Sequence, residues 1–320
     1  MNAPTDTVSR PDIQAAHDRI APHIRKTPVM QIAGSEVGHD MPVSLKLELF
    51  QHTGSFKPRG AFNNLLSKPV PPAGVAAASG GNHGAAVAYA AGRLGHRADI
   101  FVPEISSPVK IARIKAVGAS VHVGGARYAD ALAHCESHQA GTDAIGVHAY
   151  DDPATVAGQG TLALEWQEQV PDLDTVLISV GGAGLISGIA TWYGGTVKVV
   201  GVEPVGAPTL HAALAAGRPV DVDINSMAAD SLGARSVGKI NHALCARHVD
   251  HVALVSDEAI RSAQAFLWTR LQIAAEPGGA AAMAALLTGG YRPQPGERLG
   301  VLVCGGNIDP ATLAAHTVSS

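Results

Sequence analysis

The chain has 320 residues and a net charge of −4, and 46% of its residues are hydrophobic against 16% charged. This balance predicts a globular protein with a substantial core and excludes a disordered or coiled-coil chain. No lysine or arginine cluster supports binding to nucleic acid or to an anionic membrane. We expect a cytoplasmic protein, because the polar residues 1–10 lack a signal-peptide pattern and three widely spaced cysteines cannot all pair.

Short apolar runs alternate with helical patterns from about residue 74 onward. Strands are predicted at 75–78, 98–102, 120–123, 144–147, 175–180, 197–202, 251–255 and 299–303. Helices are predicted at 85–94, 109–117, 128–138, 156–169 and 185–192. Strands this apolar, separated by helices, are typical of parallel sheets covered on both faces. The predicted fold class is therefore α/β, with right-handed crossovers.

Four small residues, Gly181, Gly182, Ala183 and Gly184, directly follow the predicted strand 175–180 and precede an apolar helix. We call them the glycine loop. Glycines at this place let backbone N–H groups surround an anion, and the helix N-terminus adds its partial positive charge. A Walker loop is absent and the spacing departs from the dinucleotide fingerprint, so the loop favours a phosphate. A tight turn without a ligand remains the alternative.

A second candidate segment, Ser79-Gly80-Gly81-Asn82-His83, lies between a predicted strand end and a predicted helix. We call it the serine loop. Loops at the carboxyl ends of parallel strands face the crevice in which α/β proteins bind ligands. Helix capping by Asn82 is the alternative interpretation, but it accounts for neither the glycines nor Ser79 and His83. We therefore expect this loop to contact a ligand.

Lys57 and Cys304 are the two remaining candidates. Lys57 follows Phe56 in a run bracketed by glycines. A lysine amine in an apolar surrounding loses water and becomes nucleophilic towards a carbonyl, although taken alone this residue would pass as a surface charge. Cys304 ends the apolar run 299–303. A buried free cysteine is most often inert, but at a strand end in the same crevice it would touch a cofactor.

Taken together and in this order, these segments resemble the fold-type II pyridoxal-phosphate (PLP) enzymes. The branch most similar to them contains the serine/threonine dehydratases (ammonia-lyases) and serine racemase. The similar segments are 55–61 for the lysine motif, 79–83 for the substrate loop, 181–184 for the phosphate loop, and 157–161, 276–280 and 304–307. The resemblance implies a tryptophan-synthase-β-like fold with the active site between two domains. Residues 1–67 and 149–320 would form the large PLP-binding domain, and residues 68–148 a small domain inserted in it.

The resemblance also implies a role for each matching residue. Lys57 would hold the cofactor as a Schiff base and exchange the Cα proton, with Ser79 as the second catalytic residue. The other implied contacts are Phe56 on the ring, Asn82 at the 3-hydroxyl oxygen, Cys304 at the ring nitrogen, Glu276 at the cofactor, Gly181, Gly182, Ala183 and Gly184 at the phosphate, and Ser79, Gly80, Asn82 and His83 at the substrate. Ala183 replaces a glycine of the family, which is tolerable if this residue needs no positive φ.

The activity implied is elimination of water from L-threonine or L-serine, which yields a 2-keto acid and ammonia. Cys304 cannot hold a proton on the ring nitrogen as a carboxylate would, so the cofactor would be a weaker electron sink. Gly80 replaces a second serine of the racemase, so efficient racemisation is not expected. A 3-hydroxyaspartate dehydratase, an amino-acid racemase, a β-replacement enzyme and a non-catalytic protein that binds PLP or another anion remain open alternatives.

The resemblance further implies a divalent-cation site in the segment 203–209. Glu203 and the Ala207 carbonyl would bind Mg²⁺ or Ca²⁺ together with water. Thr209 stands where related enzymes place an additional acidic residue, so a monovalent cation or no cation is an equal alternative. The expected partners are a small amino-acid substrate and a second copy of the chain in a homodimer, with no nucleic acid and no membrane.

Overall fold

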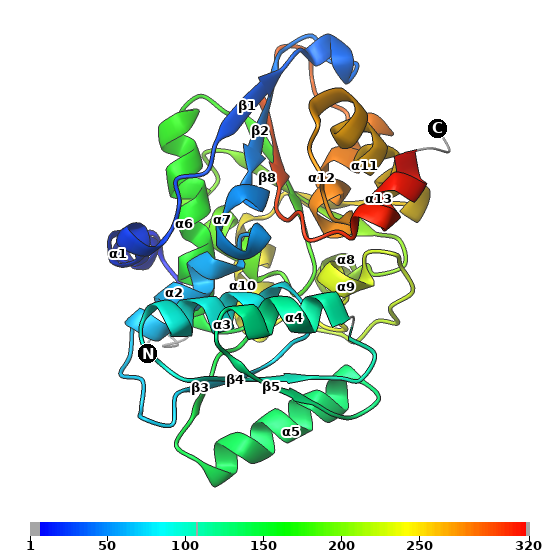
Figure 1. Cartoon of the computed structure of the whole chain (residues 1–320). Helices are drawn as coiled ribbons and strands as arrows, with labels where there is room; N and C mark the ends of the chain where they lie inside the picture. Colours follow the sequence, from blue (N-terminus) through cyan, green and yellow to red (C-terminus); the bar gives the residue numbers. More distant parts are fainter. Residues whose placement is uncertain (1–6, 107, 318–320) are drawn as a thin grey trace.

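The computed structural model describes residues 7–106 and 108–317, which form two sheets flanked by helices (Figure 1). The six-stranded sheet has the order β1-β2-β10-β7-β8-β9, and the four-stranded sheet has the order β5-β4-β3-β6. The strands are β1 (Val29–Ile32), β2 (Val43–Leu47), β3 (Val75–Ala78), β4 (Ala98–Val102), β5 (Ser120–Val123), β6 (Ile145–Gly146), β7 (Thr175–Ser179), β8 (Lys198–Pro204), β9 (His251–Val255) and β10 (Leu299–Val303). Among these pairings only β1–β2 is antiparallel. The α/β prediction is confirmed.

Helices cover both faces of each sheet. They are α1 (Arg10–Ile20), α2 (Lys57–Leu66), α3 (Asn82–Arg93), α4 (Pro108–Ala116), α5 (Tyr128–Gly141), α6 (Pro153–Gln169), α7 (Gly184–Tyr193), α8 (Thr209–Ala216), α9 (Ala229–Leu232), α10 (Lys239–His248), α11 (Asp257–Leu271), α12 (Pro277–Leu287) and α13 (Pro310–Thr317). Figure 1 shows α5 below the four-stranded sheet, and α3 and α4 above it on the side of the larger sheet. None of the helices in the described residues has the length and apolar character needed to span a membrane.

The buried central strands explain why the sequence shows continuous apolar runs. In β7, Val176 and Ile178 pack into a core with α6, α7 and α10, whereas Leu177 packs into a second core with α11 and α12. Successive side chains of a strand point to opposite faces, so a strand covered on both faces needs apolar residues throughout. All eight predicted strands are present. The strands β1 and β2 were not predicted.

The two sheets are built from different stretches of the chain. All four strands of the smaller sheet lie between residues 75 and 146, inside the predicted insert 68–148. The chain then returns to the larger sheet along residues 147–151, which we call the crossing segment, before α6 begins. The domain boundaries themselves stay a prediction. The parallel strands β2, β7 and β10 end at the same edge of the larger sheet, and the segments that follow them carry the candidate residues.

Candidate active site

The lysine segment is joined to the end of β10 by backbone hydrogen bonds. The N–H of Phe56 donates to the carbonyl of Cys304 at 3.1 Å, and the N–H of Gly306 donates to the carbonyl of Gly54 at 2.9 Å. Lys57 follows as the first residue of α2. These two motifs therefore meet in the fold, although they are about 250 residues apart in the sequence.

The amine of Lys57 is partly buried and held by a neutral partner. Its Nζ donates to the carbonyl of Ala149 at 2.9 Å and lies 5.1 Å from the centroid of the Phe56 ring. Burial lowers the pKa of Lys57 to about 8, and the acidic groups of Cys304 and Glu276 offset only part of this effect. The amine is thus far more often neutral near pH 7 than a surface lysine, which makes it a nucleophile and a base.

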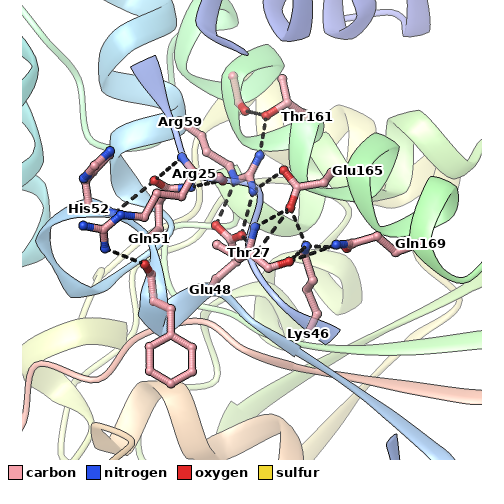
Figure 2. Close-up of polar contacts among 12 residues, drawn as sticks. Arg25, Thr27, Lys46, Glu48, Gln51, His52, Arg59, Thr161, Glu165 and Gln169 are labelled. Carbon is pink, nitrogen blue, oxygen red and sulfur yellow. Dashed lines mark hydrogen bonds and ion pairs between the residues drawn. The ribbon is translucent and has the colours of Figure 1, made fainter. Parts of the chain in front are cut away.

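A buried ion cluster of four charged residues holds α2, the helix that begins at Lys57 (Figure 2). Arg59 donates to Glu48 at 2.7 and 2.8 Å and to Glu165 at 2.9 Å, and Lys46 pairs with Glu165. The side chains of these four residues are at most 2% exposed, and their charges cancel. The cluster ties α2 to β2 and α6, because its members come from those three elements and the turn that follows β2.

The amide of Asn82 is the centre of a polar network. Its Nδ2 donates to Glu276 at 2.6 Å, and its Oδ1 accepts a hydrogen bond from Asn307 at 2.7 Å. Gly81 is the N-cap residue of α3. The capping interpretation of Asn82 is therefore wrong, and its second amide hydrogen is left for a ligand. Burial raises the pKa of Glu276 to about 7.

Cys304 is a buried, neutral thiol. Its side chain is 4% exposed, and Sγ contacts the Gly278 carbonyl at 3.5 Å. Burial is the largest cause of a strongly raised pKa of this thiol. A group that stays protonated and uncharged can contact a ring nitrogen, but it cannot hold a positive charge there.

The glycine loop leaves its backbone donors free. Among the described residues, no acceptor binds the N–H groups of Gly181–Gly184. Ala183 has φ 68° and ψ 1°, which is the left-handed region. The condition under which alanine is easily tolerated at this position, a negative φ, is therefore not met. An alanine in this region costs roughly 1–2 kcal/mol, so the surrounding structure must hold the loop in place.

The serine loop is tied to the crossing segment through His83. The imidazole is buried, and burial together with the charge of Lys57 lowers its pKa to about 3. A neutral ring has one N–H, so Nε2 donates it to the Val147 carbonyl at 2.8 Å. Ser79 accepts a hydrogen bond from the N–H of Gly81 at 3.2 Å, which closes the loop on itself. Only Nδ1 of His83 remains for a ligand.

The chain matches the family model described as pyridoxal-phosphate dependent enzyme over residues 20–305. It belongs to this family. The phenylserine dehydratase of Ralstonia pickettii is 38% identical over 97% of this chain and 98% of that protein. The L-threonine ammonia-lyase of Geobacter sulfurreducens is 36% identical over 94% of this chain and 76% of that protein. The structure of maize serine racemase is similar with a TM-score of 0.91 at 32% identity and covers 98% of both chains.

The site has the donors that the family's cofactor, PLP, requires. The unpaired N–H groups of the glycine loop match a phosphate, and the low-pKa amine of Lys57 matches an aldehyde. These two parts lie close together, because Lys57 contacts Ala149 and the next residue, Tyr150, packs on the glycine loop. The predictions of the family and of the cofactor are confirmed.

The lowered pKa of Lys57 gives a testable pH dependence. We expect the rate at which the apoprotein captures PLP to rise about fivefold between pH 7 and pH 8, as the neutral amine rises to about half of the population, and to level off above pH 9. An ordinary lysine, with a pKa near 10.5, would give a rate that still rises tenfold per pH unit at pH 9. Stopped-flow absorbance of holoenzyme formation measures the profile, and the second result would contradict the lowered pKa.

Sequence reasoning missed Ser106, which lies beside Gly80. A Cβ atom built on Gly80 would overlap the Ser106 hydroxyl. The space of a side chain at position 80 is therefore filled by a hydroxyl from the loop after β4. The available signal was weak: Ser106 follows the carboxyl end of a strand that neighbours β3, where ligand-binding residues gather in such sheets.

At the candidate cation site, the carboxylate of Glu203 is hydrogen-bonded to the backbone. Glu203 is fully buried, and its two carboxylate oxygens accept the N–H groups of Leu210 at 2.7 Å and His211 at 2.9 Å. Thr209 donates its hydroxyl to the Ala234 carbonyl, and Ala207 is buried. Within residues 7–106 and 108–317, no three His, Cys, Asp or Glu side chains are grouped to hold a metal. Glu203 serves here as a cap for the N-terminus of α8.

This arrangement predicts that removal of metal ions leaves the thermal stability of the protein unchanged. We expect the holoenzyme treated with EDTA to keep its melting temperature within about 1 °C, because both carboxylate oxygens of Glu203 already accept backbone N–H groups of α8. Adding 5 mM Mg²⁺ or Ca²⁺ to the treated protein should restore nothing. A melting temperature that falls with EDTA and returns with Mg²⁺ or Ca²⁺ would instead support the cation site at Glu203 and Ala207.

Proposed function

We propose that the protein eliminates water from a small β-hydroxy amino acid, L-threonine or L-serine, and produces a 2-keto acid and ammonia. The observation that carries this proposal is the amine of Lys57, whose pKa of about 8 suits proton transfer near neutral pH. The activities of two relatives, a threonine ammonia-lyase and a phenylserine dehydratase, support it.

Each step is assigned to a residue of this chain. Bound PLP supplies an electron-withdrawing ring that stabilises negative charge at the substrate Cα. Lys57 accepts the Cα proton, and the electron pair of that C–H bond forms a double bond to Cβ while the C–O bond breaks. The hydroxyl takes up the proton that Lys57 accepted and leaves as water, and a second water converts the released product to keto acid and ammonia. The neutral thiol of Cys304 favours prompt departure of the hydroxyl, because it leaves the ring a weaker electron sink.

The other residues bind and orient. Asn82 keeps one amide hydrogen for the 3-hydroxyl oxygen of the cofactor, and Phe56 packs beside the Lys57 amine. The N–H groups of Gly181–Gly184 take the phosphate. The backbone of the serine loop and the hydroxyl of Ser79 take the substrate carboxylate, with His83 fixing the loop against the crossing segment.

A substrate panel tests this function. The panel contains L- and D-serine, L- and D-threonine and both 3-hydroxyaspartates, with keto acid and ammonia measured together. We expect equal amounts of keto acid and ammonia from L-threonine or L-serine. Turnover confined to 3-hydroxyaspartate would show that the proposed substrate is wrong and that the proposed type of reaction is right. A purified protein that takes up no PLP would overturn the proposal.

A racemase is the second candidate, and the hydroxyl of Ser106 favours it. This group fills the place of a side chain at Gly80, so the serine loop has a proton donor there despite the glycine. If Ser106 delivers a proton to Cα, Ser106→Ala should lower the rate of racemisation about 10²-fold and leave the rate of elimination within about threefold. Chiral chromatography of recovered serine gives both rates. An unchanged ratio of the racemisation rate to the elimination rate would show that Ser106 takes no part in the reaction.

Two further proposals concern the state of the protein in the cell. A homodimer is supported by family membership and by the frequency of twofold oligomers. A cytoplasmic location is supported by three free, buried cysteines, since such thiols persist in a reducing compartment. The division into a domain of residues 1–67 and 149–320 and an insert of residues 68–148 is proposed on the membership of the two sheets.

A further inference from the structure

One buried amide outside the predicted site joins the glycine loop to the crossing segment. Asn241, on α10, is fully buried. Its Nδ2 donates to the Tyr150 carbonyl at 3.0 Å and to the Gly182 carbonyl at 2.9 Å. Both amide hydrogens are thus used on carbonyl oxygens of two segments that are not otherwise hydrogen-bonded to each other within the described residues. Its Oδ1 is buried without a partner there, so the amide is oriented by these two bonds alone.

The two segments that Asn241 joins are packed without spare room. A Cβ atom on Gly182 would overlap the ring of Tyr150, and one on Gly184 would lie 2.8 Å from its carbonyl oxygen. Tyr150 is itself fixed at its hydroxyl, which donates to the Ser236 carbonyl at 3.3 Å. The position of the glycine loop therefore depends on where Tyr150 lies.

The hydrogen bonds to the carbonyl groups of the glycine loop also determine which of its backbone polar groups stay available to a ligand. The Gly182 carbonyl is taken by Asn241, and the Ala183 carbonyl by the N–H and hydroxyl of Ser187 at 2.9 and 2.7 Å. With these acceptors bound on the protein side, the N–H groups of the loop are left for an anion. The left-handed conformation of Ala183 opposes this arrangement, so the hydrogen bonds must offset its cost.

The crossing segment also carries the partner of Lys57. Three consecutive residues are used: Ala149 accepts from Lys57 Nζ, Tyr150 accepts from Asn241, and Asp151 accepts the N–H groups of residues 239 and 240 at the start of α10. The crossing segment thus sets the positions of both the Lys57 amine and the glycine loop. Residues of α10 bind this segment at Tyr150 and Asp151.

We infer that Asn241 is a positioning residue, which holds the glycine loop in its anion-binding conformation and at its working distance from Lys57. This inference rests on the proposed PLP site and extends it to a residue that touches neither the cofactor nor the substrate. Asn241 therefore affects affinity for the phosphate of the cofactor and leaves the chemistry at Lys57 intact.

The test compares PLP with pyridoxal, which has the same aldehyde but no phosphate. Dissociation constants of both are measured by absorbance titration of the apoprotein for the wild type, Asn241→Leu and Asn241→Asp. We expect Asn241→Leu to bind PLP at least tenfold more weakly, because two carbonyls lose their donor. Asn241→Asp should be weaker still, because a carboxylate faces two carbonyl oxygens. Pyridoxal should bind all three proteins within about twofold.

Asn64→Leu is the matched control. Asn64 is another fully buried amide, and it donates two hydrogen bonds, to Asp152 and Thr155, away from the glycine loop. We expect it to lower the melting temperature as much as Asn241→Leu does, with an unchanged ratio of PLP to pyridoxal affinity. Equal losses for both ligands in Asn241→Leu, or no loss for PLP, would overturn the inference. A wild type that binds neither ligand would overturn the proposed function instead.

Discussion

Lys57→Ala is expected to remove the visible absorption band of the purified protein and to lower kcat by about 10²–10⁴-fold through the loss of proton transfer alone. The physical reason is that two other titratable side chains of the site, His83 and Cys304, are poor replacements for this base. His83 is neutral with its N–H bound to Val147, and the thiol of Cys304 stays protonated. Absorbance spectra and a continuous keto-acid assay at saturating substrate measure both effects.

Two controls separate this result from a general loss of structure. Lys115→Ala removes an exposed lysine and should change neither the band nor kcat. Added methylamine should restore part of the lost activity of Lys57→Ala, since a small amine can fill the place of the side chain and accept the proton. A variant that keeps its visible band and its full kcat would show that the cofactor is held elsewhere.

The sequence predicts much of the sheet because central parallel strands need apolar residues on both faces. The central strands β3, β4, β7, β8 and β10 follow this rule, and the edge strands β5, β6 and β9 still carry short apolar runs. The strand β2 escapes it because Lys46 interrupts its apolar pattern, and only the fold reveals that Glu165 neutralises this lysine inside the core. The strand β1 is an antiparallel edge strand whose residues are mostly half-exposed, so its pattern is weak.

The residues of the site also fall into two groups, those that the sequence indicates and those that only the folded structure reveals. Lys57, Asn82 and Cys304 lie in motifs whose composition is unusual, and the structure brings them together. Ser106 and Asn241 lie in segments with no such composition, and their contacts with Gly80 and Gly182 depend on the folded chain. A residue whose contribution depends on its position in the fold, with an ordinary local sequence, leaves little signal in one sequence.

Arg59→Met is expected to be the most destabilising single change in the buried ion cluster, with a loss of about 3–5 kcal/mol in the free energy of unfolding. The substitution leaves Glu48 and Glu165 in the core with one cation, Lys46, and removes three hydrogen bonds to carboxylate oxygens. Arg261→Met is the control, because it breaks an exposed pair with Glu258 and should cost under about 1 kcal/mol. Urea unfolding of both variants measures the difference, and equal midpoints would show that the cluster contributes no more than a surface ion pair.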